Sequence, residues 1–257
     1  MTIDAIAHGA RVLCAVSGGV DSMYLLHRMA ELGAQRGFTV GCAHFNHGLR
    51  GVESDRDEAF VRAQCEKLGV PFYAGRGDVT SVRGMGTEAA ARELRYAFLT
   101  HCADEHGYDW IATAHTADDN AETLLLNLAR GMGPRGAGGI PRRRDKLRRP
   151  LLGVSRAEVE FLCKVFHLDW VEDSTNAEET YTRNRLRRRV LPELREINPR
   201  LSDAVSRFTA SMALENDFMQ AQAEALLRAA RTAGGLSLPV LRAAHPALLH
   251  RALEIYL

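Results

Sequence analysis

Short apolar runs alternate with amphipathic helical segments over the first 130 residues, and this alternation constrains the fold more than any other feature. Strand-length apolar runs at 11–16, 38–45, 70–73 and 109–114 are followed by segments of helical periodicity at 21–32, 55–68, 87–106 and 118–130. Parallel strands need such crossovers, and the crossover is usually a helix. The sequence therefore predicts an α/β fold, a doubly wound parallel sheet with helices on both faces. Gly33 is expected to end the first helix.

The second half of the chain has a different pattern. A glycine-rich loop (131–139) leads into a basic run, Ser155 is expected to cap a helix over 156–166, and 173–182 is polar and loop-like. From Pro199 onward the pattern is helical, with Ser202 as the expected cap of a segment that reaches residue 231 and a helical hairpin at 237–256. We therefore expect a domain at 1–200 and a C-terminal helical segment at 201–257. Its last residues have no cap, as in a trimmed chain or one with an unusually short C-terminal region.

The composition is that of an ordinary globular protein of 257 residues, with 46% hydrophobic and 25% charged side chains. No run approaches the ~18 apolar residues of a bilayer-spanning helix, and the first ten residues lack the basic start of a signal peptide. Five scattered cysteines without a CxxC pair argue against a disulfide framework and against a zinc or iron–sulfur site. We therefore expect a cytoplasmic protein without membrane contact, whose cysteines are small buried hydrophobic residues.

Basic residues are concentrated in one region. Residues 141–200 contain 15 Lys and Arg against 10 Asp and Glu, whereas the rest of the chain contains 18 against 22. Two runs carry the excess, RRRDKLRR at 142–149 and RNRLRRR at 183–189. Such runs can be solvated surface, but two in one region favour a patch that faces a polyanion.

The strongest local motif is SGGVDS, between the first strand and the first helix. Glycines allow a tight turn whose successive N–H groups point at one anion, and the start of the following helix adds its positive dipole end. A carboxylate here could hold Mg²⁺ between phosphate oxygens. The alternative is a simple turn between strand and helix. The predicted phosphate-binding residues are Ser17, Gly18, Gly19, Val20, Asp21 and Ser22, with Asp21 also a magnesium ligand.

A second motif, AHTADDNAET at 114–123, follows the fourth strand. Asp119 and Glu122 are three residues apart and so share one helix face. Two carboxylates beyond the ends of parallel strands can bind Mg²⁺ or an ammonium group. The alternative is that these acids only cap the helix, for which Asp118 alone would suffice.

Two further segments are weaker candidates. HFNHGLR (44–50) follows the second strand, and we expect His44 to belong to a nucleotide-facing loop. A surface loop is the alternative, and metal ligation by His44 and His47 has no third partner of suitable spacing. On the helix at 87–106, Arg92 and Arg95 are candidates to face phosphate, with ion pairing along the helix surface as the default.

Taken together, these motifs resemble bacterial tRNA(Ile)-lysidine synthetases. SGGVDS is similar to the pyrophosphate loop of the N-type ATP pyrophosphatases, and HFNHGLRG, AHTADDNAETLLLNLARG, EDSTN (172–176), YTRNRLR (181–187) and VLP (190–192) are similar to the synthetases in particular. The resemblance covers about residues 10–200. It implies a Rossmann-like fold of the adenine nucleotide alpha hydrolase type. It also implies adenylation of C2 of the wobble cytidine with ATP and Mg²⁺, and then displacement of AMP by free L-lysine.

The resemblance also implies roles for individual residues. Ser17 to Ser22 would bind the ATP phosphates, and Asp21, Asp119 and Glu122 would serve Mg²⁺ and lysine as catalytic residues. Arg92, Asn184, Arg185 and Arg189 would bind substrate, the last three within a segment that faces an isoleucine tRNA with a CAU anticodon. Which carboxylate does which task stays open, as does the oligomeric state, a dimer included. Two rivals are a tRNA 2-thiolation enzyme, which generally needs cysteines for sulfur transfer, and a catalytically silent RNA-binding module.

Overall fold

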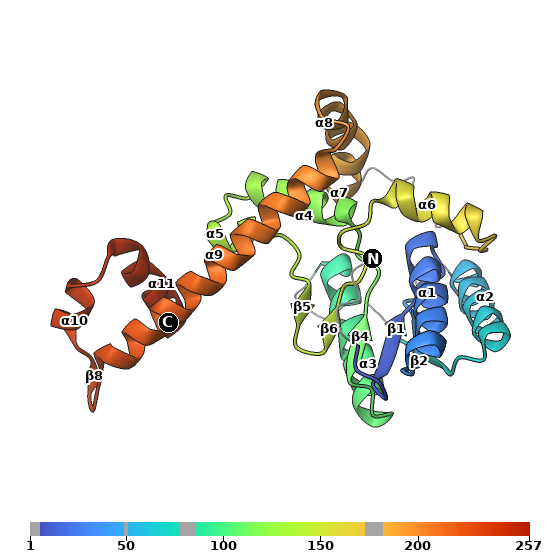
Figure 1. The fold of residues 1–257 in the computed structure, drawn as a ribbon, viewed down its shortest axis with the longest axis horizontal. Coiled ribbons are helices and arrows are strands. Elements are labelled where there is room, and N and C mark those ends of the chain that lie inside the picture. Colours follow the sequence, from blue (N-terminus) through green and yellow to red (C-terminus); the bar gives the residue numbers. More distant parts are fainter. Residues whose placement is uncertain (1–5, 49–50, 78–85, 173–181) are drawn as a thin grey trace.

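A computed structural model describes residues 6–48, 51–77, 86–172 and 182–257. Its main sheet has the strand order β3-β2-β1-β4-β6-β5, in which β5 is antiparallel to β6 and all other neighbours are parallel. The strands are β1 (Arg11–Ala15), β2 (Thr39–Asn46), β3 (Phe72–Arg76), β4 (Trp110–Ala112), β5 (Arg143–Arg144) and β6 (Leu147–Arg148). Figure 1 shows helices on both sides of this sheet. The predicted doubly wound α/β fold is confirmed.

The connecting helices agree with the sequence prediction in number and place. They are α1 (Val20–Arg36), α2 (Val52–Leu68), α3 (Thr87–Glu105) and α4 (Ala117–Ala129). The prediction that Gly33 ends α1 was wrong, because the helix continues to a left-handed Gly37. Gly33 is instead needed for packing, since a Cβ there would lie 2.7 Å from the carbonyl oxygen of Phe38.

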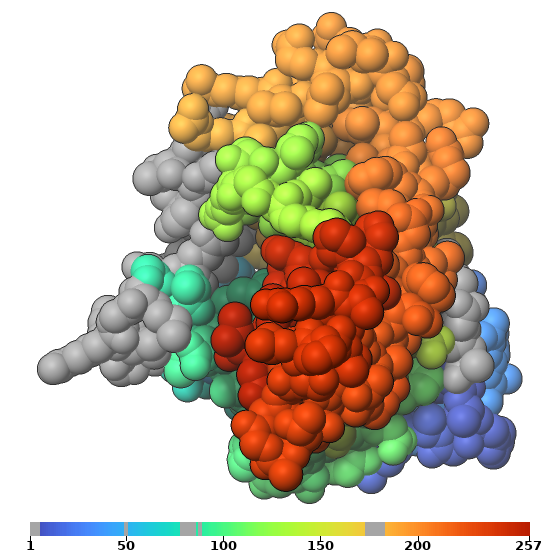
Figure 2. All heavy atoms as spheres, turned by 90° about the vertical axis from the view of Figure 1, so that its left-hand side faces the viewer, coloured from blue at the N-terminus to red at the C-terminus, as the bar shows by residue number. Residues whose placement is uncertain are grey.

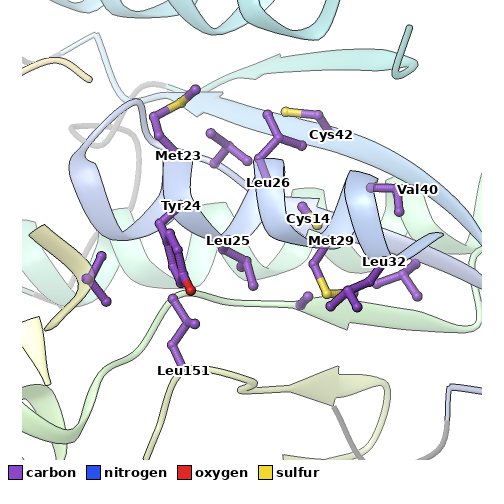
Figure 3. Packing of buried hydrophobic residues seen from close by; sticks show 14 of the residues in the cluster. Cys14, Met23, Tyr24, Leu25, Leu26, Met29, Leu32, Val40, Cys42 and Leu151 are labelled. Carbon is purple, nitrogen blue, oxygen red and sulfur yellow. The ribbon is translucent and has the colours of Figure 1, made fainter. Parts of the chain in front are cut away.

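Alternating strand residues supply two cores, one on each face of the sheet. Val12 and Cys14 of β1 pack with Met23, Leu26 and Met29 of α1 on one face (Figure 3). On the other face β1 and β4 pack against α3, through Leu13, Ile111, Leu99, Cys102 and Ala103. All five cysteines are buried, as the composition suggested.

The glycine-rich and basic segments contain structure that the sequence did not predict. Residues 131–139 include a short helix α5 (Pro134–Ala137), and the basic run forms the hairpin β5–β6 through Asp145 at φ +50°. Strand β6 pairs with β4 through only two residues, which is too short for an apolar periodicity that would predict a strand. The third strand is also shifted toward the C-terminus relative to the predicted 70–73.

The C-terminal half is helical, as predicted. After α6 (Arg156–Val165), capped by Ser155, come α7 (Thr182–Arg185), a π-helix η3 (Leu186–Val190), α8 (Leu191–Ile197) and the long α9 (Leu201–Ala230). A small hairpin, β7 (Arg231–Thr232) and β8 (Gly235–Leu236), leads to α10 (Leu238–Arg242) and α11 (Pro246–Tyr256), which packs back on α9. The predicted loop at 173–182 lies outside the described residues except for its last residue.

Helix α9 runs along the α/β unit and then away from it (Figure 1). The α5 segment lies against α9 (Figure 2), where Asn216 donates to the carbonyl of Pro134 at 2.8 Å and Arg135 donates to Gln220 at 3.0 Å. Within the described ranges, no helix has both the length and the apolar character that crossing a bilayer requires.

Candidate active site

The carboxyl ends of β1 and β4 lie side by side where the strand order changes direction. From β1 the chain continues to β2 and β3 on one side, whereas β4, β6 and β5 lie on the other. In open α/β sheets, ligands bind in the crevice beyond such a point. SGGVDS follows β1 and the acidic turn follows β4, so the two strongest sequence motifs lie at this switch point, and the region between them is the candidate crevice.

The loop from Ser17 to Ser22 closes around the hydroxyl group of Ser22. This oxygen accepts hydrogen bonds from the backbone N–H groups of Ser17 and Gly18, both at 3.2 Å, and donates to the carbonyl of Gly19 at 2.8 Å. Gly18 has φ +100°, which side chains rarely adopt. Because α1 begins immediately afterward, at Val20, its unpaired N–H groups face the same loop. The turn is therefore suited to hold an anion.

Asp21 lies in the first turn of α1 with its carboxylate only partly satisfied. Oδ2 accepts a hydrogen bond from Nη1 of Arg156 at 2.6 Å, whereas Oδ1 is buried and has no partner among the described residues. Burial raises the pKa of Asp21 to about 6, although the Arg156 guanidinium lowers it and the nearby Asp119 raises it further. Such an unsatisfied carboxylate oxygen is open to a cation or a donor group.

His44 contacts the residue that leads into the phosphate-loop candidate. Its ring is 4% exposed and its Nδ1 lies 2.9 Å from the carbonyl oxygen of Val16, the residue before Ser17. The histidine therefore connects β2 to the start of the loop. This contact positions the loop, and the burial of the ring argues against the surface-loop alternative.

The acidic turn is capped through Thr116 and Asp119, and not through Asp118, the residue that would have sufficed in the capping alternative. Thr116 is the N-cap of α4, and Asp119 completes a capping box by accepting from the N–H group of Thr116 at 2.8 Å. Oδ2 of Asp119 is used in this way, and Oδ1 lies on the crevice side with two arginines 3.4 and 3.5 Å away. Capping and a ligand role thus use different oxygens of Asp119.

Glu122 is completely buried and forms ion pairs with two arginines. Its Oε2 accepts from Nε of Arg183 at 2.8 Å and its Oε1 accepts from Nε of Arg187 at 2.5 Å. Burial lowers the pKa of Arg187, but the contacts with Glu122 outweigh this and leave it raised. The sequence analysis missed both arginines. Their spacing of four residues, which puts both on one helix face, was the available signal.

Asp118 joins four helices instead of capping one. Oδ2 accepts from the backbone N–H of Arg156 at 2.5 Å, and Oδ1 accepts from Arg195 at 2.5 Å and from the hydroxyl of Ser202 at 2.6 Å. Ser202 therefore does not cap α9, contrary to the prediction, and the N-cap position is held by Arg200. Asp118 therefore holds the start of α4 against the starts of α6 and α9 and against α8.

A second set of arginines lies near the crevice without carboxylate partners in the described part of the chain. The guanidinium groups of Arg92 and Arg95 lie 4.9 and 5.3 Å from the ring centre of Tyr96. Arg149 is 6% exposed, donates to the carbonyl of Pro141 at 2.5 Å and has a buried, unpartnered Nε. Burial lowers the pKa of both Arg95 and Arg149, and the pKa of His115 nearby is lowered by its own burial. Phosphate groups would supply the missing anion.

The remaining predicted substrate residues lie on the segment that carries Arg183 and Arg187. Asn184 is half-buried in α7, and Arg185 and Arg189 are exposed. Arg183 and Arg187, which the prediction did not name, bring this segment to the acidic pair.

The carboxylates on the two sides of the crevice fit a magnesium ion. Asp21 and Asp119 provide oxygen donors from two helix starts, and the buried Oδ1 of Asp21 lacks a partner among described residues. Magnesium prefers one or two carboxylates, with substrate phosphates and water completing its shell. No group of three or more His, Cys, Asp or Glu residues that could hold a metal occurs in the described ranges, so the donor set does not suit a closed protein-only site.

The fold and crevice together define an α/β protein with a phosphate-loop site at the switch point of its sheet. Residues 3–194 match the family model of the PP-loop domain, an ATP-binding domain. This chain belongs to the PP-loop domain family. A solved structure with this fold is the U34-tRNA thiolase NcsA from Methanococcus maripaludis with its [4Fe-4S] cluster. It has a TM-score of 0.68 and 19% sequence identity, over 80% of this chain and 72% of that one.

Curated relatives give a finer comparison. The chain is 37% identical over 224 residues to the tRNA(Ile)-lysidine synthase of Bacillus cereus, 38% over 200 residues to that of Petrotoga mobilis and 44% over 194 residues to that of Chlorobaculum tepidum. These matches cover 84%, 77% and 74% of this chain but 47%, 64% and 59% of the respective relatives. The chain thus spans between about half and two thirds of their length.

Proposed function

We propose that this chain carries the catalytic part of a tRNA(Ile)-lysidine synthetase, which joins L-lysine to C2 of the wobble cytidine in the isoleucine tRNA with a CAU anticodon. The observation that carries the proposal is the pairing of a phosphate loop with an acidic turn across one crevice, in a chain 37–44% identical to lysidine synthases. The proposed cellular location is the cytoplasm. We further propose the domain boundary between residues 200 and 201, supported by a family match that ends at 194 and by α9, which begins at Leu201.

The first step is adenylation of the cytidine. The C2 oxygen attacks the α-phosphorus of ATP, the bond to the β-phosphate oxygen breaks, and pyrophosphate leaves. The N–H groups of the first turn of α1, which begins at Val20 within the loop, are suited to hold the phosphates. Arg149 and the arginines stacked on Tyr96 are suited to balance charge that develops on pyrophosphate. Magnesium, held by Asp21 and Asp119, would supply Lewis-acid charge neutralisation when bound.

The second step is displacement of AMP. The neutral ε-amino nitrogen of lysine attacks C2, the C2–O bond breaks, and AMP leaves with the former C2 oxygen. The attacking amine must lose protons, so a nearby carboxylate is needed to orient the ammonium form and accept a proton. Asp119 and Glu122 are the proposed carboxylates for the ammonium.

The rival thiolation chemistry has less support in this chain. Sulfur transfer needs an accessible thiol or a cluster, whereas all five cysteines are buried, and burial raises the pKa of Cys14 and Cys163. The structural likeness to the thiolase concerns the fold.

Mass spectrometry of tRNA nucleosides tests the proposal. The chain is incubated with ATP, Mg²⁺, labelled L-lysine and a tRNA(Ile) transcript with a CAU anticodon, and lysidine should appear. An Asp21→Ala variant is the control and should form none, although it stays folded. A transcript that remains unmodified at every enzyme and tRNA concentration, with the parent folded and ATP bound, would refute the proposed reaction.

A further inference from the structure

The acidic pair proposed to take the cationic substrate is already occupied by cations of the chain itself. Both oxygens of the fully buried Glu122 accept hydrogen bonds from Nε atoms, one of Arg183 and one of Arg187. The same two guanidinium groups lie 3.5 and 3.4 Å from Oδ1 of Asp119. An ammonium group seeks the same oxygen lone pairs. Because Glu122 is completely buried with the two guanidinium groups against it, an ammonium group could reach it only by displacing a guanidinium.

The segment that carries the two arginines is joined to the acidic pair by these ionic contacts. From Arg183 to Val190 every side chain is half-buried or exposed, and the next fully buried one is Leu191, at the start of α8. Apolar burial, the usual source of a permanent attachment, is therefore small here. The backbone of η3 is a π-helix. This form is rare in proteins overall, but where it occurs it is often at a functional site.

The same segment has a second class of partner available. Residues 183–189 contain five arginines and no acidic residue, which is the composition that RNA phosphates attract. Arginine binds phosphate and carboxylate with the same bidentate geometry. A phosphate backbone on this segment would thus compete with Asp119 and Glu122 for the guanidinium groups.

We propose that Arg183 and Arg187 form a latch on the acidic pair, which a primary ammonium substrate can enter only when RNA phosphates draw the two arginines away. The inference rests on the proposed function for the identity of the two ligands. The latch implies a binding order, in which RNA binds first and the amino acid second. Because coupling between two binding sites is reciprocal, the ammonium must raise the affinity for RNA by the same factor by which RNA raises the affinity for the ammonium.

Isothermal titration calorimetry tests the latch with two probes, L-lysine and n-butylammonium. The variant is Arg183→Gln/Arg187→Gln, and the matched control is Arg188→Gln, which makes the same substitution at an exposed position of η3. Without RNA, the double variant should bind both probes at least tenfold more tightly than the parent and the control. A tRNA transcript should tighten binding to the parent about tenfold and to the double variant less than twofold.

Equal affinities of parent and double variant without RNA would overturn the latch, as would an equal effect of tRNA on both. If a thermal unfolding control shows that the double variant does not fold, the titrations of the parent protein are the test. A probe affinity of the parent that is the same with and without tRNA contradicts the proposal. Nucleoside mass spectrometry separates this from the proposed function. A parent that forms no lysidine refutes the reaction, whereas the n-butylammonium titrations still decide the latch.

Discussion

Replacing Asp21 with asparagine is expected to stabilise the ligand-free protein while it abolishes ATP-dependent turnover. The side chain of Asp21 is 19% exposed, and burial raises its pKa from the ordinary 3.8 to about 6, against the lowering effect of Arg156. A carboxyl group whose pKa is higher in the folded state costs no stability below the unfolded pKa. The cost grows as the pH rises toward the folded pKa and is complete above it. Because a pKa difference of one is worth about 1.4 kcal/mol, the full cost is about 3 kcal/mol.

Asparagine has the same shape and can still accept a hydrogen bond from Arg156, but it loses the attraction between opposite charges. The expected net gain is therefore about 1–3 kcal/mol at neutral pH. Urea unfolding without nucleotide or divalent cation, at about pH 7 and about pH 4, measures it. The gain should shrink to below ~1 kcal/mol at the lower pH, where the aspartate is protonated in the folded state and about half protonated in the unfolded state. Asp104→Asn, an exposed carboxylate paired with Lys146, is the control and should change stability by less than ~1 kcal/mol. A variant no more stable than the parent at neutral pH, or equally stabilised at both, would refute the reasoning.

Three further predictions concern the frame of the site and its basic surface. Asp118→Ala removes three contacts of a nearly buried carboxylate and should cost about 3–5 kcal/mol in chemical unfolding; a loss below ~1 kcal/mol would show that the four helices do not depend on it. Gly41→Ala would put a Cβ 2.0 Å from the hydroxyl of the buried Tyr108 and should cost about 1–3 kcal/mol or more, which a thermal melt detects; an unchanged melting temperature would mean that β2 shifts freely. Replacing Arg142, Arg143 and Arg144 with alanine should weaken binding to cognate and non-cognate tRNA alike and flatten the dependence of log affinity on log salt; a slope equal to the parent's would mark the run as solvated surface.

The parts of the site that could be predicted from the sequence are those encoded within a few residues. SGGVDS and the pair Asp119–Glu122 each combine a strand end, a helix start and chemically active side chains in one short stretch. Their placement on one crevice follows from the parallel sheet, since the carboxyl ends of parallel strands share an edge. The fold class was accessible for the same reason.

The parts that could not be predicted depend on partners far away in the chain. Arg183 and Glu122 are 61 residues apart, and Ser202 and Asp118 are 84 apart. No local pattern distinguishes an arginine that meets a buried carboxylate from one that meets water. Similarly, β6 has only two residues and is defined by its pairing with β4, so Arg149, which follows it, was predicted only as one member of a basic run that faces a polyanion.

A single residue links the two sides of the crevice. Arg156 donates its backbone N–H to Asp118 at the start of α4 and its guanidinium Nη1 to Asp21 at the start of α1. The backbone contact is independent of the charge on Asp21, so neutralising Asp21 weakens one end of this bridge and leaves the other unchanged. For this reason the stability change in Asp21→Asn should be confined to the loop side, whereas Asp118→Ala should loosen α6, α8 and α9 together. The acidic turn of α4 is thus the fixed point of the site, and the phosphate loop and the arginine segment are positioned relative to it.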